Sequence, residues 1–138
     1  MERTLTIVKP QAVKNNHFGL IFDIITSNGF KVIGMKMIHF TPKRAGLFYE
    51  VHRHKPFFKK LTNFMSNGPV IVAVLEKENA ISDFRKLIGN TNPEMAEEGT
   101  IRSMFGVSID DNGIHGSDSA QSAQIEIDFH FSAGELFS

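Results

Sequence analysis

The feature that most constrains the fold is an uninterrupted apolar run from Val70 to Leu75, directly after the turn residues Asn67-Gly68-Pro69. A strand with one face in water alternates apolar and polar residues, whereas a strand buried on both faces does not. The turn residues in front of the run mark the point where such a strand begins. The run therefore predicts a buried strand near the centre of a β-sheet.

Periodicity and turn residues predict the elements around this strand. Gly29 and Gly89 each follow an apolar helical pattern, where a left-handed residue commonly ends a helix. Thr41 before Pro42 is a favourable helix start, and a hairpin of two short helices is expected after it. We expect strands at 4–8, 30–40, 70–75 and 112–116, and helices at 20–25, 47–51, 57–65, 78–87 and 118–128.

The late part of the chain contains a loop signal and a capping signal. Residues 90–99 hold too many turn residues for regular structure, and a loop of this length in a compact domain is often functional. Asp118 and Gln121 resemble a capping box at the start of the last helix, and the tail after Asp128 is expected to be irregular.

The order of these elements is strand-helix-strand, helical hairpin, strand-helix-strand-helix. This order fits a ferredoxin-like α/β sandwich of the α+β class, with a four-stranded antiparallel sheet and helices on its face. Strand-helix-strand units are right-handed, so their two helices are expected on the same face. The chain has 138 residues, the usual length of one domain, and 1–138 is expected to be a single domain.

Composition argues against several classes of function. Fifteen basic and fifteen acidic residues give no net charge at pH 7, which argues against a broad basic surface for nucleic acid. The absence of cysteine excludes disulfides, thiolate catalysis and cysteine-based zinc sites. The start is not signal-like and no apolar run reaches about 18 residues, so we expect a cytoplasmic protein without a membrane partner.

The chemistry concentrates in the segment from Asn112 to Ser119, which places His115 between a strand and a helix start. A neutral imidazole is a competent nucleophile at neutral pH, and its phosphoramidate is reactive enough to pass the phosphoryl group on. Gly116 is expected to remove bulk beside the imidazole. A His-Gly-Ser triplet alone is weak evidence, so the case for His115 depends on its neighbours.

Four donors suited to phosphate oxygens precede His115: Lys9, Arg85, Thr91 and Arg102. The chain has no Walker-type glycine loop, so bound phosphate must be held by side chains, and the P-loop kinases are excluded. His52-Arg53-His54 lacks nearby acids and a third ligand, which is more typical of a polar surface than of a metal site, and no metal ligands are predicted.

Several motifs occur together in order and spacing: Thr6 to Pro10, Lys55 to Phe58, Ser66 to Val70, Thr91-Asn92-Pro93, Gly99 to Arg102, and Asn112-x-Ile114-His115-Gly116-Ser117-Asp118-Ser119. In these motifs the chain resembles the nucleoside diphosphate kinase family over essentially its full length, with the short tail of bacterial members. The resemblance implies transfer of the γ-phosphoryl group of a nucleoside triphosphate, typically ATP, to a nucleoside diphosphate. The phosphoryl group would travel in a ping-pong mechanism through a phosphohistidine at His115.

The resemblance also implies roles for other positions. Glu126 would hold the second ring nitrogen of His115, with Ser117 as a supporting residue. Phe57 would stack on the base. Contacts to phosphates, ribose hydroxyls or the surroundings of the histidine would come from Lys9, Tyr49, Arg85, Thr91, Arg102 and Asn112, and Leu61 and Ile109 would line the base slot. From the residues alone, Phe57, Leu61 and Ile109 fit a hydrophobic core, Tyr49 fits an amphipathic helix, and Glu126 fits a solvated helix face.

The resemblance further implies Mg²⁺ as cofactor and a homo-oligomer, a tetramer or hexamer built from dimers. Two pairs depart from the family pattern: Gln11-Ala12 stands where Asp-Gly is common, and Ser103-Met104 where Gly-Asp is common. The second departure puts the rigidity of the Arg102 segment in question.

Two alternatives are a nucleic-acid-binding module of the same fold and an inactive scaffold. The nucleic-acid-binding module is disfavoured because Val70 to Leu75 lacks the aromatic and basic residues that such modules carry on their central strands. The inactive scaffold is disfavoured because every candidate catalytic position is occupied.

Overall fold

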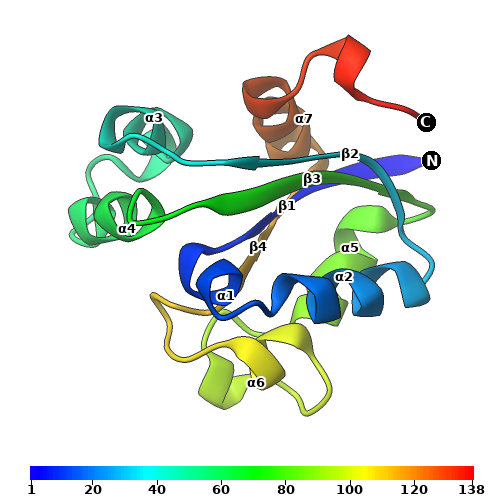
Figure 1. Ribbon diagram of the computed structural model, residues 1–138, viewed down its shortest axis with the longest axis horizontal. Coiled ribbons are helices and arrows are strands. Elements are labelled where there is room, and N and C mark those ends of the chain that lie inside the picture. The colour runs from blue at the N-terminus through cyan, green and yellow to red at the C-terminus, as the bar shows by residue number, and fades with distance from the viewer.

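The computed structural model describes residues 1–138 and is built on a four-stranded sheet in the order β2-β3-β1-β4 (Figure 1). The strands are β1 (Glu2–Val8), β2 (Lys31–Ile38), β3 (Val70–Lys77) and β4 (Ile114–Gly116). Every neighbouring pair is antiparallel. β3 lies between β2 and β1, so the prediction that the apolar run forms an inner strand is confirmed.

The remaining elements are helical. The α-helices are α1 (Pro10–Lys14), α2 (Phe18–Ser27), α3 (Pro42–Phe48), α4 (Phe58–Met65), α5 (Ala80–Ile88), α6 (Ile101–Phe105) and α7 (Ala120–His130). Three single 3₁₀ turns complete the chain: Glu50–His52, Pro93–Met95 and Ala133–Glu135. None of the helices combines the length and the apolarity needed to cross a membrane.

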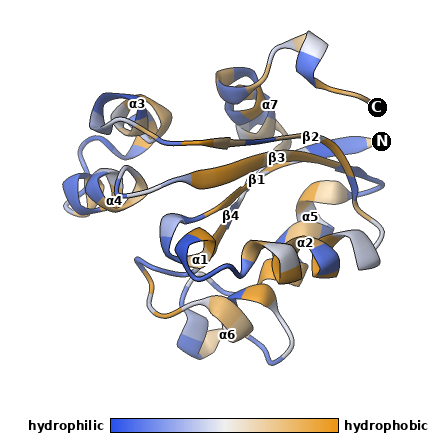
Figure 2. Ribbon diagram, viewed as in Figure 1, coloured by the Kyte–Doolittle hydropathy of each residue, from blue (hydrophilic) through white to orange (hydrophobic).

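Helices cover both faces of the sheet, which explains the unbroken apolar sequence of β3 (Figure 2). Ile71, Ala73 and Leu75 pack in one cluster with α2 and α5. Val70, Val72 and Val74 pack in the other cluster with residues of α3, α4 and α7. The two crossover helices α2 and α5 share one cluster, so the prediction that they lie on the same face is also confirmed.

The start of the last helix differs from the prediction. The N-cap is Ser119, whose hydroxyl accepts a hydrogen bond from the backbone N–H of Ser122 at 3.0 Å, so the predicted capping box of Asp118 and Gln121 is wrong. Serine is as good an N-cap as aspartate, so local propensity alone does not distinguish Ser119 from Asp118. Asp118 is left outside the helix with its side chain exposed.

Two short helices went unpredicted. α1 begins immediately after Lys9, because Pro10 suits the first position of a helix. α6 begins after Thr100, whose hydroxyl accepts from the N–H of Ser103. Each helix has only five residues, too few for an apolar period to be visible in the sequence. Both helices matter for function, because they fix Lys9 and Arg102.

Candidate active site

All but one of the candidate residues line a single cleft of about 710 Å³. The cleft lies between the end of β1, the α3–α4 hairpin, the segment from α5 to residue 112, and the strand-to-helix connection from β4 to α7. The candidates that line it are Lys9, Tyr49, Phe57, Leu61, Arg85, Thr91, Arg102, Ile109, Asn112, His115 and Glu126. The exception is Ser117, which is fully buried and touches the cleft only through Glu126.

His115 is fixed by the backbone of the sheet. It lies in the middle of β4, opposite Ile7 of β1, and its carbonyl accepts a hydrogen bond from Thr6 Oγ1 at 2.8 Å. A Cβ at Gly116 would come within 2.9 Å of Phe84 and 3.0 Å of Ile88. The missing side chain therefore makes room for α5 against β4.

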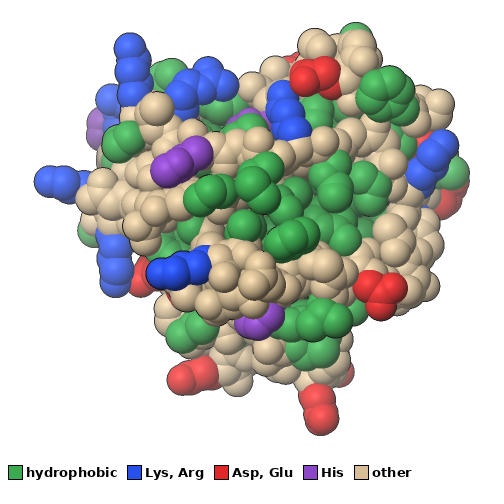
Figure 3. All heavy atoms as spheres, viewed as in Figure 1, with side chains coloured by type: hydrophobic (Ala, Val, Ile, Leu, Met, Phe, Trp, Pro, Cys, Tyr) green, Lys and Arg blue, Asp and Glu red, His purple; other side chains and the backbone are tan.

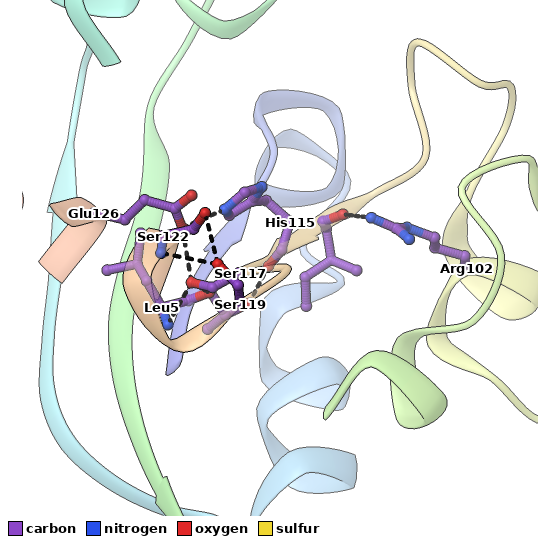
Figure 4. A network of polar contacts seen from close by, with 9 residues as sticks. Leu5, Arg102, His115, Ser117, Ser119, Ser122 and Glu126 are labelled. Carbon is purple, nitrogen blue, oxygen red and sulfur yellow. Dashed lines mark hydrogen bonds and ion pairs between the residues drawn. The ribbon is translucent and has the colours of Figure 1, made fainter. Parts of the chain in front are cut away.

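A short chain of hydrogen bonds orients the imidazole (Figure 4). The backbone N–H of Leu5 donates to Ser117 Oγ at 3.1 Å, and this hydroxyl donates to Glu126 Oε1 at 2.7 Å. The same carboxylate oxygen is 2.8 Å from His115 Nε2. The imidazole is thereby tied through two side chains to the backbone of β1.

This arrangement selects one tautomer of His115. An ionised carboxylate only accepts hydrogen bonds, so the ring nitrogen that faces Glu126 must carry the hydrogen. A neutral imidazole has one N–H and one lone pair, and with the hydrogen on Nε2 the lone pair lies on Nδ1. The His115 side chain is 20% exposed and lines the cleft. The geometry thus leaves Nδ1 as the nucleophilic atom.

Arg102 is held by two backbone carbonyls. Its Nη1 donates to the Gly89 carbonyl and its Nη2 to the Ile114 carbonyl, each at 2.9 Å. The second bond ties the guanidinium to the strand that carries His115. Both bonds form although Met104, which is half exposed, stands where an acid is common, while the buried Nε of Arg102 has no partner within the protein. Burial, with Arg85 nearby, lowers the pKa of Arg102 to about 10, so it remains charged at neutral pH.

Lys9 and Asn112 are buried polar groups at the same end of the cleft. Lys9 is 7% exposed and Asn112 only 2%. Burial, followed by the nearby Arg102 charge, lowers the pKa of Lys9 to about 8. The Asn112 amide donates to the Thr91 carbonyl at 3.1 Å, while its Oδ1 has no partner within the protein. Buried polar atoms are normally paired, so the unpaired oxygen is suited to a ligand's hydroxyl.

The opposite end of the cleft is apolar and open. Phe57, at the start of α4, is 43% exposed, and Ile109 across the cleft is 57% exposed. Both line the cleft with Leu61, so the interpretation of Phe57 and Ile109 as core residues is wrong. An ion pair of 2.8 Å between Lys60 Nζ and Asp110 Oδ2 joins the two sides.

Sequence reasoning missed several residues of the cleft. The Phe48 ring packs edge-on against His115, with 5.9 Å between ring centroids, and against Tyr49 at 4.9 Å. Tyr49 is buried with an unpaired hydroxyl, and burial, with the charge of Glu126 as a smaller cause, raises its pKa. Phe48 gave no signal because it fits an ordinary apolar helix face. Asp118 and Ser122 also line the cleft, and Asp118 belongs to the motif that contains His115.

Comparison with known proteins agrees with this geometry. The sequence profile of a family described as nucleoside diphosphate kinase matches residues 2–136. A nucleoside diphosphate kinase of Geotalea uraniireducens is 55% identical over 136 residues, which cover 99% of both chains. One of Flavobacterium psychrophilum is 51% identical over 135 residues, 98% of this chain and 97% of the relative. The crystal structure of the Aquifex aeolicus nucleoside diphosphate kinase has a TM-score of 0.96 at 49% identity, with 98% of both chains covered. The chain therefore belongs to the nucleoside diphosphate kinase family.

Proposed function

We propose that this enzyme moves the γ-phosphoryl group of a nucleoside triphosphate to a nucleoside diphosphate by way of Nδ1 of His115. The observation that carries the proposal is the 2.8 Å contact of Nε2 with Glu126, which leaves the other nitrogen free to attack. In the first half-reaction the Nδ1–P bond forms, the bond from γ-phosphorus to the bridging oxygen breaks, and the diphosphate leaves. A second diphosphate then attacks the phosphohistidine from the same cleft.

The cations of the cleft have a catalytic role in this scheme. Phosphoryl transfer depends mainly on positioning and on charge stabilisation by groups already in place. Lys9 and Arg102 are held at the end of the cleft that contains His115, and Arg85 lies exposed on α5 beside Arg102. We assign these three side chains, with the Thr91 hydroxyl, to the phosphate oxygens. The buried Asn112 amide is placed to contact the sugar hydroxyls.

The residues of the cleft also fit a Mg²⁺ ion that arrives with the nucleotide. No group of three His, Asp or Glu residues could hold a metal ion alone, so the phosphates must supply most of the ligands. Among the acids of the cleft, Glu126 is engaged with His115 and Asp110 with Lys60, while Asp118 is exposed and free of ion pairs. Asp118 is the residue that would hold the ion or one of its waters. When bound, Mg²⁺ neutralises charge on the phosphate oxygens.

The alternative of a nucleic-acid-binding module conflicts with the fold. Such modules of this architecture stack bases on an open sheet face. Here the two inner strands β1 and β3 are buried under helices on both faces. An inactive scaffold is equally disfavoured, because the candidate residues converge on one cleft.

We further propose that the chain forms homo-oligomers through the edge strand β2. Met35 and Met37 on this strand are 48% and 57% exposed, and hydrophobic side chains gather over the middle of this face of the molecule (Figure 3). Contiguous apolar surface of this kind is typical of protein–protein interfaces. A tetramer and a hexamer built from such dimers are both compatible with this edge, and light scattering after size-exclusion chromatography distinguishes them.

The experiment that tests the function is a labelling reaction with [γ-³²P]ATP and Mg²⁺. We expect one phosphate per chain that is labile in acid and stable in base, located on His115, and released by any nucleoside diphosphate. Steady-state rates at several fixed concentrations of the second substrate should give parallel double-reciprocal lines. Intersecting lines, or label that survives acid, would falsify the covalent mechanism.

A further inference from the structure

Lys9 differs from the other lysines of the chain in its surroundings. It is the only lysine that lines the cleft, and its ammonium group has no ion-pair partner. Arg102, Thr91 and Asn112 line the same end of the cleft. Lys14, five residues further along on α1, is exposed and provides a natural comparison. Small molecules that the neighbouring phosphate-binding side chains hold in the cleft therefore contact this amine.

We propose that Lys9 is an acylation site for small acyl phosphates, which place their phosphate on the cleft cations and their carbonyl carbon beside the amine. The amine nitrogen attacks the carbonyl carbon, a C–N bond forms, and the bond from carbon to the phosphate oxygen breaks. Inorganic phosphate leaves with the bonding electrons, and the surplus proton of the amine passes to water or to the phosphate. The proposal rests on the proposed function in one respect, because it requires that the cleft binds phosphate.

The charge environment of Lys9 favours this reaction. Arg102 on α6 faces the amine as a like charge, while Asp110 and Asp111 on the adjoining loop act in the opposite direction. Burial is the larger cause, and the pKa falls from 10.5 to about 8. At pH 7.5 the neutral amine is then roughly 200-fold more abundant than at an exposed lysine. A less basic amine is also a weaker nucleophile. With a Brønsted slope of ~0.5, the value known for thiols, the lower pKa reduces the reactivity of the neutral amine about 15-fold and offsets part of this advantage. Acylation about tenfold faster than at a lysine with the ordinary pKa of 10.5 remains.

Acylation at this position is expected to inhibit the enzyme. The product is an uncharged amide that removes one phosphate-binding cation and fills the space beside His115. Bound nucleotide shields the amine, so modification is expected only when the cleft is empty. The site thus couples the activity of the enzyme to the ratio of acyl phosphate to nucleotide.

The test uses the full-length wild-type protein and acetyl phosphate, with peptide mass spectrometry to follow a gain of about 42 Da at each lysine. Acetylation of Lys9 that is faster than that of Lys14 and suppressed by ADP supports the proposal. An equal or slower rate at Lys9, or a rate that ADP leaves unchanged, overturns it. Transfer of phosphate to His115, a gain of about 80 Da, without acetylation of Lys9 also overturns it.

Two controls separate the possible causes. Phenyl acetate is an acyl donor without a phosphate group, so the rate ratio of Lys9 to Lys14 is expected to fall severalfold; an unchanged ratio overturns docking through phosphate. K9R is expected to lose acetylation at this position, whereas K14R keeps it. The same protein is also labelled with [γ-³²P]ATP. Phosphohistidine without Lys9 acetylation refutes only this inference, while absence of phosphohistidine refutes the proposed function.

Discussion

The two ends of the cleft are built in opposite ways. At the phosphate end, His115, Arg102 and Asn112 are each held by hydrogen bonds of 2.8 to 3.1 Å, to helix α7 for His115 and to a neighbouring strand or loop for the other two. At the base end, Phe57 and Ile109 are about half exposed and offer apolar surface only. The first end is polar and held by hydrogen bonds, and the second is open and apolar.

This difference separates catalysis from recognition. Transfer of a phosphoryl group requires a nucleophile and charge-stabilising donors within a fraction of an ångström of their productive positions. Acceptance of several bases requires the absence of buried polar groups that only one base can satisfy. In the proposed function the same cleft serves both requirements, because the two sets of residues come from different elements. The phosphate end is built on β1, β4 and α6, whereas Phe57 and Leu61 belong to the α4 hairpin.

The largest effect is expected from removal of the nucleophile. H115A should lower kcat/KM by more than about 10⁴-fold, because His115 carries the phosphoryl intermediate in the proposed mechanism. H54A removes an exposed histidine outside the cleft and is expected to have wild-type kinetics. Coupled-enzyme assays and acid-labile labelling measure both variants. Substantial transfer by H115A would place the nucleophile elsewhere.

Loss of one charge-stabilising donor is expected to be the next largest effect. R102A should lower kcat by roughly 10²-fold, the usual scale for a preorganised donor. It also leaves the carbonyls of Gly89 and Ile114 unpaired, which should lower the free energy of unfolding by about 1–3 kcal/mol in urea. R85A is the matched control, because Arg85 is exposed and bonded to no carbonyl: kcat should fall without loss of stability. Equal unfolding midpoints for R102A and wild type would contradict the structural role of Arg102.

The fold was predictable where the sequence repeats a simple signal. The apolar run at β3, the Thr41 cap and the glycines after α2 and α5 identified the sheet, the hairpin and the crossover helices. The five-residue helices α1 and α6 were not predictable, because each is shorter than the period that would reveal it. The N-cap of α7 was also assigned to the wrong residue, since Asp118 and the adjacent Ser119 are equally favourable N-caps.

The candidate site was predictable as a set of residues but not as a geometry. Resemblance to the family named His115 and the cleft residues, but their residue types alone assigned Phe57 and Ile109 to the core. Only the fold shows that these side chains face an open cleft, because exposure depends on tertiary contacts far apart in sequence. The bond of the Leu5 N–H to Ser117, which in turn bonds Glu126, joins residues 112 positions apart and has no local signature.

A decrease in kcat/KM of about tenfold at alkaline pH is expected from Lys9 at the phosphate end. Lys9 is charged below its pKa of about 8, so kcat/KM should fall by about tenfold between pH 7 and pH 9 as the ammonium is lost from the free enzyme. The folded-state pKa lies below the unfolded value of 10.5, so between these values the unfolded chain binds more protons. The contribution of Lys9 to the free energy of unfolding therefore rises with pH in this window. As pH rises, kcat/KM falls while the contribution of Lys9 to the free energy of unfolding rises. The loss of activity can therefore be distinguished from alkaline unfolding.

K9R is the control for this pH profile. Arginine stays charged throughout the range, so the descending limb near pH 8 should disappear even if the absolute rate is lower. Measurement of kcat/KM from pH 6.5 to 9.5 for both proteins decides the point. A limb that persists in K9R would assign the titration to another group.

The smallest effects are expected at the base end, and they should be nearly the same for every base. Stacking on an aromatic ring contributes about 1–3 kcal/mol per base, and the half-exposed Phe57 belongs at the low end of that range, so F57A should raise KM about fivefold. Because every base has a π-face, the increase should be similar for adenine, guanine, cytosine and uracil diphosphates. Apolar contacts distinguish related ligands by only about 1–3 kcal/mol, so a preference of the wild type beyond roughly 10³-fold would exceed what Phe57, Leu61 and Ile109 can supply. Steady-state kcat/KM for the four diphosphates, in wild type and F57A, measures both quantities. A strong preference for one base would require a polar contact that Phe57, Leu61 and Ile109 do not offer, and the tail of the same or a neighbouring subunit would then be the segment to truncate.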